Sequence, residues 1–175
     1  MSITTLTEKL SAAQSPLKAG YRELPASANI ILHASGKVSQ SELACDVSTF
    51  LGTTRSGLHP AAGGDGSLAC SGDMLLEALV GCAGVTLAAV ATAIGVTIRD
   101  SDIHADGDLD FRGTLGVDRA APVGFSAIRM RFALDTDASD AQLETLKKLT
   151  ERYCVVQQTL AKGVPIETRF VRLEA

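Results

Sequence analysis

The chain has no tryptophan, and aromatic residues make up only 4% of its 175 positions. Its hydrophobic core must therefore be built mainly from Leu, Val, Ile and Ala. The sequence also lacks a basic cluster interleaved with aromatics, the pattern typical of nucleic-acid binding. Sixteen basic and twenty acidic residues give a net charge of -4. These features predict neither nucleic-acid binding nor attachment to a membrane surface.

The first 20 residues contain no positively charged segment followed by an apolar block, so we expect no secretory signal there. The four cysteines are therefore expected in a reducing compartment, and we predict a cytoplasmic protein. The apolar run over residues 74–90 is close to the length of a membrane span. It is interrupted by Glu77 and by several Gly and Thr residues. A buried core helix is the better interpretation.

Metal-binding spacing is missing from the sequence. No two cysteines form a Cys-x-x-Cys pair, and the three histidines show no i, i+4 spacing. A cysteine hydrolase would need a histidine placed beside its nucleophile, and none has an obvious catalytic context. The glycine-rich stretch over 57–66 is not followed by Gly-Lys-Ser/Thr, so it does not predict a phosphate-binding loop. We expect neither a metal nor another cofactor.

Periodicity and turn residues predict a single α+β domain over residues 1–175, beginning with a helical N-terminal arm over 1–25. Strands are predicted over 28–35, 42–50, 103–113, 126–134 and 164–173. The first two are expected to form a hairpin through a turn at Gly36 and Lys37. The pair 103–113 and 126–134 alternates apolar with charged residues, which favours antiparallel pairing with one solvated face.

A central helix is predicted over residues 71–94. Ser71 is a suitable N-cap, Asp73 complements the helix dipole, and Gly95 provides a stop. Both faces of this helix are apolar, which predicts burial on all sides. The strands of one chain can cover only one face, so the pattern also predicts an obligate two-fold dimer.

A second helical segment is predicted over residues 139–162. It begins with a capping box formed by Ser139 and Gln142. Cys154 falls where the first part of this segment ends, and Gly163 terminates the second part.

Two cysteines lie in the most apolar stretches, Cys82 in the central helix and Cys154 in the second helical segment. In a thiol peroxidase, one thiolate attacks the O–O bond and becomes a sulfenic acid, which a second thiol converts to a disulfide. The middle of a helix gains little from the helix dipole, so Cys82 would need a cation from tertiary structure, such as an arginine oriented by a carboxylate. The alternative is that Cys82 is a small core residue. Cys45 and Cys70 are expected to be packing and loop side chains.

The stretch from Cys70 to Cys82 resembles the central-helix motif of the OsmC/Ohr family of thiol peroxidases. Residues 153–160, Tyr-Cys-Val-Val-Gln-Gln-Thr-Leu, followed by Gly-Val-Pro at 163–165, resemble the second-cysteine motif of that family. Residues 108–113 and 122–125, between the two motifs, fit as well. The resemblance extends over about residues 41–170.

This resemblance implies antiparallel sheets around a long buried central helix, in an intertwined homodimer with two active sites built from both subunits. It implies that Cys82 is the peroxidatic thiol and Cys154 the resolving thiol. Organic hydroperoxides would be the substrates, and a dithiol donor such as a lipoyl protein would be the reductant. The family needs no metal or prosthetic group.

The sequence also departs from the family pattern. Many members have Pro-Glu ten or eleven residues before the first cysteine, and that Glu orients a catalytic arginine. Here Ser71 and Gly72 occupy these positions, and the nearest carboxylate is Asp73. Arg55 is our candidate for the arginine, with Arg22 as the second choice. Cys154 is followed by Val rather than the common Pro. A second hypothesis is therefore a binding or scaffold protein that keeps the fold without peroxidase turnover.

Overall fold

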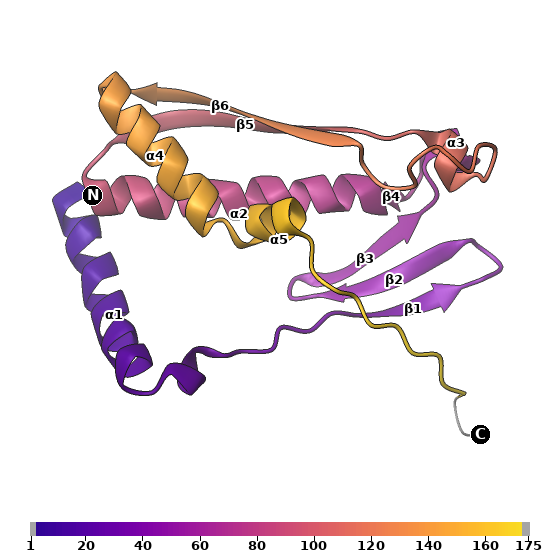
Figure 1. Cartoon of the computed structure of the whole chain (residues 1–175), viewed down its shortest axis with the longest axis horizontal. Coiled ribbons are helices and arrows are strands. Elements are labelled where there is room, and N and C mark those ends of the chain that lie inside the picture. The colour runs from indigo at the N-terminus through magenta and orange to yellow at the C-terminus, as the bar shows by residue number, and fades with distance from the viewer. Residues whose placement is uncertain (1–2, 173–175) are drawn as a thin grey trace.

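A long helix, α2 (Ser71–Ile94), runs through the middle of the molecule with one sheet on each side of it (Figure 1). The computed structural model describes residues 3–172. The α2 helix begins and ends where predicted, although its N-cap is Cys70 rather than Ser71. Gly95 adopts the left-handed conformation with φ 74° and closes the helix, a conformation that glycine accepts without a Cβ clash.

The first sheet has four strands in the order β1 (Ser35–Ser39), β2 (Ala44–Thr49), β3 (Gly52–Gly57) and β4 (Ala69–Cys70). The first three pair antiparallel, and β4 joins β3 in parallel. The predicted hairpin has its turn at a different place. Gly36 and Lys37 lie inside β1 rather than in a turn, and residues 29–34 form no strand. No strand between residues 3 and 172 pairs with residues 29–34.

The second sheet is a long antiparallel pair, β5 (Ile98–Asp108) and β6 (Ala127–Thr136), as the alternating pattern predicted. Strand β5 ends at Asp108 and not at the predicted residue 113, because a short helix, α3 (Phe111–Thr114), follows it. A Cβ at Gly107 would lie 2.5 Å from the ring of Phe125, so the ring packs there only because residue 107 is glycine.

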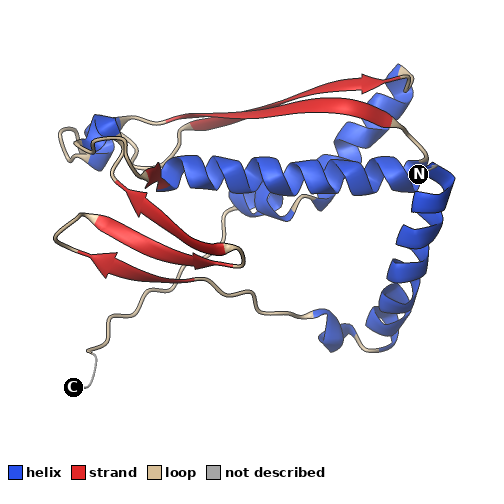
Figure 2. Ribbon diagram, turned by 180° about the vertical axis from the view of Figure 1, so that it is seen from behind, coloured by secondary structure: helices blue, strands red, loops and turns tan. Residues whose placement is uncertain are grey.

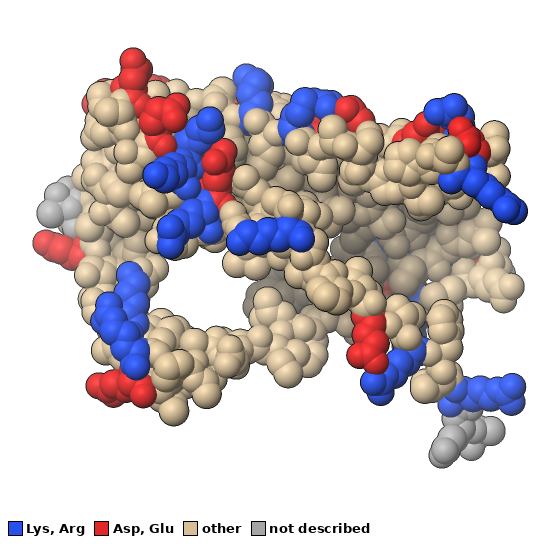
Figure 3. Space-filling view, viewed as in Figure 1, with Lys and Arg blue, Asp and Glu red and all other residues tan. Residues whose placement is uncertain are grey.

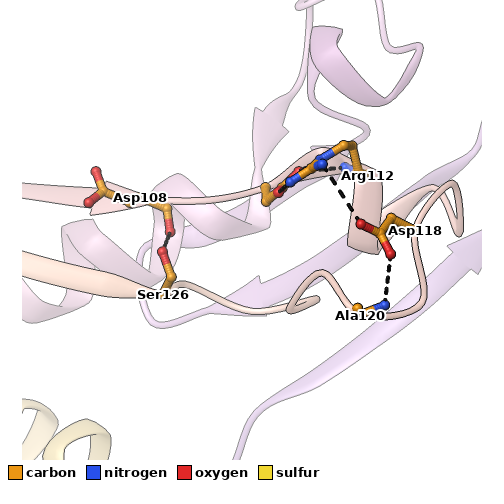
Figure 4. Close-up of polar contacts among 6 residues, drawn as sticks. Asp108, Arg112, Asp118, Ala120 and Ser126 are labelled. Atoms are coloured by element: carbon orange, nitrogen blue, oxygen red, sulfur yellow. Dashed lines mark hydrogen bonds and ion pairs between the residues drawn. The ribbon is translucent and has the colours of Figure 1, made fainter.

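Polar contacts order the connection between β5 and β6 (Figure 4). The Ser126 hydroxyl donates to the Asp108 carbonyl oxygen at 3.2 Å, and Arg112 Nη1 lies 3.7 Å from an Asp118 carboxylate oxygen. The Ala120 N–H donates to the other oxygen of Asp118 at 2.9 Å. These contacts order the connection itself, which lines a cavity together with the first turn of α2.

The remaining helices are α1 (Ile3–Glu23), α4 (Asp140–Tyr153) and α5 (Val155–Lys162), with 3₁₀ turns η1 (Pro25–Ala28) and η2 (Pro60–Ala62). The capping box of Ser139 and Gln142 is present as predicted. Helix α1 continues through Gly20 to Glu23, within the arm predicted over 1–25. A glycine costs a helix only about 1 kcal/mol, too little to end it here.

The closing strand predicted over 164–173 is absent from residues 164–172, and residue 173 lies outside the described residues. Residues 163–172 leave α5 as an extended tail (Figure 1). Its large apolar side chains are exposed: Val164, Ile166, Phe170 and Val171. An extended segment becomes a strand only beside a partner strand, and none lies next to this tail in the described chain.

Helix α2 is not buried on all sides within one chain. One side packs against β5, α4 and α5, and supplies the buried residues Leu79, Ala83, Leu87, Val90, Ala91 and Thr92. On another side, Leu75, Ala78, Gly81, Val85 and Ala88 are exposed. By length and composition alone α2 could cross a membrane, and 28% of its most apolar window is buried inside the molecule. Our expectation of no membrane role stays a prediction.

The core lies between α2, α4 and the β5–β6 pair, and Leu146 of α4 is at its centre with 1% of its surface exposed. Replacing Leu146 by Ala removes buried methyl groups and leaves a cavity, so we expect a loss of about 2–5 kcal/mol in the free energy of unfolding. Urea denaturation followed by circular dichroism measures it. Leu115→Ala, at a side chain 55% exposed, is the control and is expected to change stability little. Equal losses for the two variants would contradict this placement of the core.

Candidate active site

The fold brings Cys82 and Cys154 together, although 72 positions separate them in the sequence. Cys82 lies in the middle of α2, and Cys154 lies between α4 and α5. Cys154 is completely buried in one cluster with Leu79 and Ala83, and Cys82 packs against this cluster. Each thiol shifts the pKa of the other. Whether they act as peroxidatic and resolving residues stays a prediction.

The chain bends at Cys154 because this residue ends one helix and begins the next. Its backbone is extended, with φ -71° and ψ 108°, and its N–H donates to the Thr150 carbonyl oxygen at 3.0 Å. Its own carbonyl accepts the first hydrogen bond of α5, from the N–H of Gln158 at 2.9 Å. The N–H groups of residues 155–157 therefore have no carbonyl partner within α5. They lie at the same end of α5 as the two thiols.

The surroundings of Cys82 favour its thiolate. Burial of the sulfur raises the pKa of Cys82, but hydrogen bonds from the N–H groups of Val156 and Val155 and from the Cys154 thiol outweigh it and lower the pKa below the usual value. The Thr86 hydroxyl contributes less. It has one proton, and it also donates to the Cys82 carbonyl oxygen at 2.7 Å. The leading contributors are all uncharged.

The surroundings of Cys154 favour the opposite protonation state. Burial raises the pKa of Cys154, and the neighbouring Cys82 raises it further, while N–H groups of Gln157 and Val156 act in the other direction. A proton on Cys154 can be donated to an ionised Cys82, and a second negative charge next to the first is disfavoured. When the pair loses one proton, these shifts favour the thiolate at Cys82 and the thiol at Cys154.

This difference predicts unequal reactivity of the two thiols. With the reduced protein at pH 7, we expect iodoacetamide to modify Cys82 at least about tenfold faster than Cys154, because the thiolate is the nucleophile and Cys154 is inaccessible. Lowering the pH through the pKa of Cys82 should slow its modification, since the thiolate becomes protonated. Peptide mass spectrometry at timed intervals measures both rates. Faster modification of Cys154 would contradict the assignment.

Neither of the two charged residues predicted for this site is hydrogen-bonded or ion-paired with Cys82 within residues 3–172 of one chain. Asp73 is exposed in the first turn of α2, nine residues before Cys82, on the order of 13 Å along the helix axis. Arg55 is on β3 and pairs with carboxylates of its own sheet, Glu42 and Asp46, the latter at 3.2 Å. Arg22 is exposed in the last turn of α1. None of these residues is among the leading contributors to the pKa of Cys82.

Sequence reasoning missed the backbone N–H groups of Val155 and Val156. We expected an arginine to stabilise the thiolate, because Cys82 lies in mid-helix. A usable signal was present in the sequence. A cysteine between two helical segments places the amino end of the second helix beside it, and helix amino ends lower the pKa of nearby thiols. The ion pair between Arg55 and Asp46 was also missed, because it depends on the register of β2 with β3.

Two apolar cavities adjoin the thiol cluster. One, of about 820 Å³, lies between β6, α4 and α5. The other, of about 540 Å³, lies at the start of α2 below the connection between β5 and β6. Ile128 and Leu160 line both cavities and also pack against the cluster that contains Cys154. Organic groups of moderate size therefore have apolar surface available beside the cluster that contains Cys154.

Solved structures with the same fold exist in several bacteria. An OsmC-like protein from Mycoplasma pneumoniae is 15% identical, with a TM-score of 0.64 over 78% of this chain and 90% of that one. An organic hydroperoxide resistance protein OsmC from Legionella pneumophila is 12% identical, with a TM-score of 0.59 over 75% and 91%. The organic hydroperoxide resistance protein OhrB of Bacillus subtilis is 15% identical, with a TM-score of 0.52 over 77% and 93%.

At these identities the solved structures show the fold alone, and they confirm the predicted α+β arrangement of antiparallel sheets and a long helix. No curated protein matches the sequence at a significant level. The family model described as OsmC-like protein matches residues 64–169, which is more than half of the chain and includes both Cys82 and Cys154. The chain belongs to the OsmC family.

Proposed function

We propose that the protein is a thiol-dependent peroxidase that reduces organic hydroperoxides. The observation that carries the proposal is the pair of thiols at one buried cluster with opposite pKa shifts, lowered at Cys82 and raised at Cys154. A thiol that attacks a peroxide must be ionised, and a thiol that waits to resolve the product is best kept protonated. Family membership and the names of the solved relatives support the same activity.

The reaction needs only the two thiols and the peroxide. The Cys82 thiolate attacks one oxygen of the O–O bond, which breaks, and the other oxygen takes up a proton and leaves as an alcohol. Cys82 is then a sulfenic acid, oxidised by two electrons. The Cys154 sulfur displaces its hydroxyl group, so that a disulfide and water form. A dithiol donor, for which we propose a lipoyl protein, reduces the disulfide by thiol–disulfide exchange.

The substrate class follows from the surface next to the sulfurs. The two cavities are lined mainly by Leu, Ile, Phe, Met and Ala side chains, and the residues that they share with the thiol cluster are apolar. An alkyl or aryl substituent gains free energy by leaving water for such a surface, whereas hydrogen peroxide has no such group. We therefore propose organic hydroperoxides as the preferred substrates.

The proposal includes a cytoplasmic homodimer. A reducing compartment keeps Cys45, Cys70 and the two active thiols reduced between turnovers. In a dimer that covers the exposed side of α2, the partner subunit could bring its own sheet near Cys82. Arg55 and Asp73 keep their proposed roles only in that arrangement, with Glu42 and Asp46 orienting the guanidinium of Arg55.

The test is a single-turnover measurement on the reduced protein. One equivalent of cumene hydroperoxide should lower the intact mass of each subunit by two hydrogens, and the digest should contain a Cys82–Cys154 disulfide. Dihydrolipoamide should then restore both thiols. The proposal is wrong if the peroxide persists in the presence of fully reduced protein.

The second candidate function is a binding protein without turnover. The cavity of about 820 Å³ favours it, because its size is in the range of small-molecule sites and its walls are mostly apolar. An organic ligand that stays with the protein in native mass spectrometry, together with thiols inert to hydroperoxides, would favour this function. Formation of the Cys82–Cys154 disulfide within one turnover would count against it.

A further inference from the structure

The amino end of α5 has backbone donors that the helix itself does not use. Cys154 is its N-cap, and the first hydrogen bond within the helix runs from the N–H of Gln158 to the Cys154 carbonyl. The N–H groups of residues 155–157 precede that bond, and the positive end of the helix dipole lies with them. Such N–H groups are satisfied by an acceptor outside the helix or by water.

The acceptor that the fold supplies is the sulfur of Cys82. Helices α2 and α5 pack against each other, and Cys82 and Val156 contact the same buried cluster of Leu79, Ala83 and Cys154. From this position the N–H groups of Val155 and Val156 lower the pKa of Cys82, each by more than the Thr86 hydroxyl does. Cys82 gains nothing from its own helix, because it lies near the middle of α2 and far from either end.

We propose that the amino end of α5, through the N–H groups of Val155 and Val156, is the group that holds Cys82 as a thiolate within one subunit. The inference rests on the proposed function and adds to it the source of thiolate activation. Val155 becomes a positioning residue whose contribution comes from its backbone and not from its side chain. The side chain is 68% exposed. No cation of the same chain is required for this activation.

The local backbone makes a decisive substitution possible. Proline has no N–H, and it is favoured at the first position of a helix, which is the position of Val155. A residue before proline must be extended, and Cys154 already is, with φ -71° and ψ 108°. Val155→Pro therefore removes one donor from the thiolate while the fold is kept. Val155→Ala is the matched control, because it removes the exposed side chain and keeps the N–H.

The readout is the rate at which iodoacetamide modifies Cys82 as a function of pH, resolved by peptide mass spectrometry. For Val155→Pro we expect the rate at pH 7 to fall by about threefold to tenfold, equivalent to a rise of half to one unit in the pKa of Cys82. For Val155→Ala we expect a change of less than about twofold. Identical profiles for the two folded variants would overturn the proposal.

A second measurement covers the case in which Val155→Pro fails to fold. In the wild-type protein, the amide NMR signals of Val155 and Val156 should shift with pH at the same midpoint as the modification of Cys82. In Cys82→Ser these shifts should be lost. Amide signals that ignore the titration of Cys82 would overturn the proposal. Neither readout involves a peroxide, so a protein that passes both tests yet leaves cumene hydroperoxide unreduced would refute the proposed function and leave this inference standing.

Discussion

Replacing Cys82 by serine is expected to abolish the reduction of cumene hydroperoxide. A serine hydroxyl stays protonated at neutral pH and cannot form a sulfenic acid, so the reaction loses its nucleophile. Removal of a catalytic nucleophile typically lowers turnover by several orders of magnitude, and we expect a fall on the order of 10³ or more. The rate of peroxide loss with excess dihydrolipoamide, followed by a dye assay for the remaining peroxide, measures it.

The other three cysteines make this test specific. In Cys154→Ser the first step is intact, so each subunit should consume one equivalent of peroxide and accumulate a sulfenic acid that dimedone traps at Cys82. Cys45→Ser and Cys70→Ser are matched controls, since both thiols are only partly buried, and we expect their turnover to be near that of the wild type. Peroxide consumption by Cys82→Ser at the wild-type rate would refute the mechanism.

Local sequence signals were enough to predict the helices that position the site. The capping box at Ser139, Gly95 in the left-handed conformation and Gly163 at the end of α5 all act within a few residues of the positions that they determine. The alternating pattern of β5 and β6 was also readable, because the period of two reports directly which side is buried. The pairing of Cys82 with Cys154 needed the resemblance of two distant motifs.

The wrong strand predictions concern two segments that lack a paired neighbour in the described chain. Residues 29–34 and 164–172 have strand-like apolar patterns, yet neither forms a strand, because a strand needs a paired neighbour and none pairs with them among the described residues. The source of thiolate stabilisation was missed for a related reason. The donors are backbone N–H groups, which residue types do not reveal directly. The one indirect sign is Val155, because the family commonly has at this position a proline, which carries no N–H.

The exposed apolar surface of one chain indicates what covers residues 29–34 and 164–172. Seen from behind, α2 lies in front of α4 and α5 (Figure 2). Val85 belongs to its exposed side, with 73% of its surface accessible. The space-filling view shows an open passage between the α1 arm and the body of the molecule (Figure 3). Ile30, Ile31 and Leu32 follow the arm and are largely exposed, as is the tail over 164–171. A monomer in water does not normally keep so much apolar surface exposed.

A second copy of the chain is the occupant that we propose for this surface. A two-fold axis places the same patch on both subunits, so two α2 helices can cover each other while each unpaired extended segment finds a strand neighbour in the partner. Both ends of the chain then contribute to the interface, which makes the dimer intertwined. Cys82 lies on the same helix as this patch, three residues before Val85, so the active site lies next to the interface.

Val85→Asp is therefore expected to break the dimer. An aspartate at the centre of an apolar interface would be a buried charge without a partner, which is disfavoured by several kcal/mol. Sedimentation at micromolar concentration should give a species of twice 18.2 kDa for the wild type, and monomer or aggregate for the variant. Ala141→Asp makes a similar change at an exposed position of α4 and should leave the dimer intact. A folded wild-type monomer at this concentration would contradict the intertwined dimer and, with it, any role for Arg55 and Asp73 of the partner at Cys82.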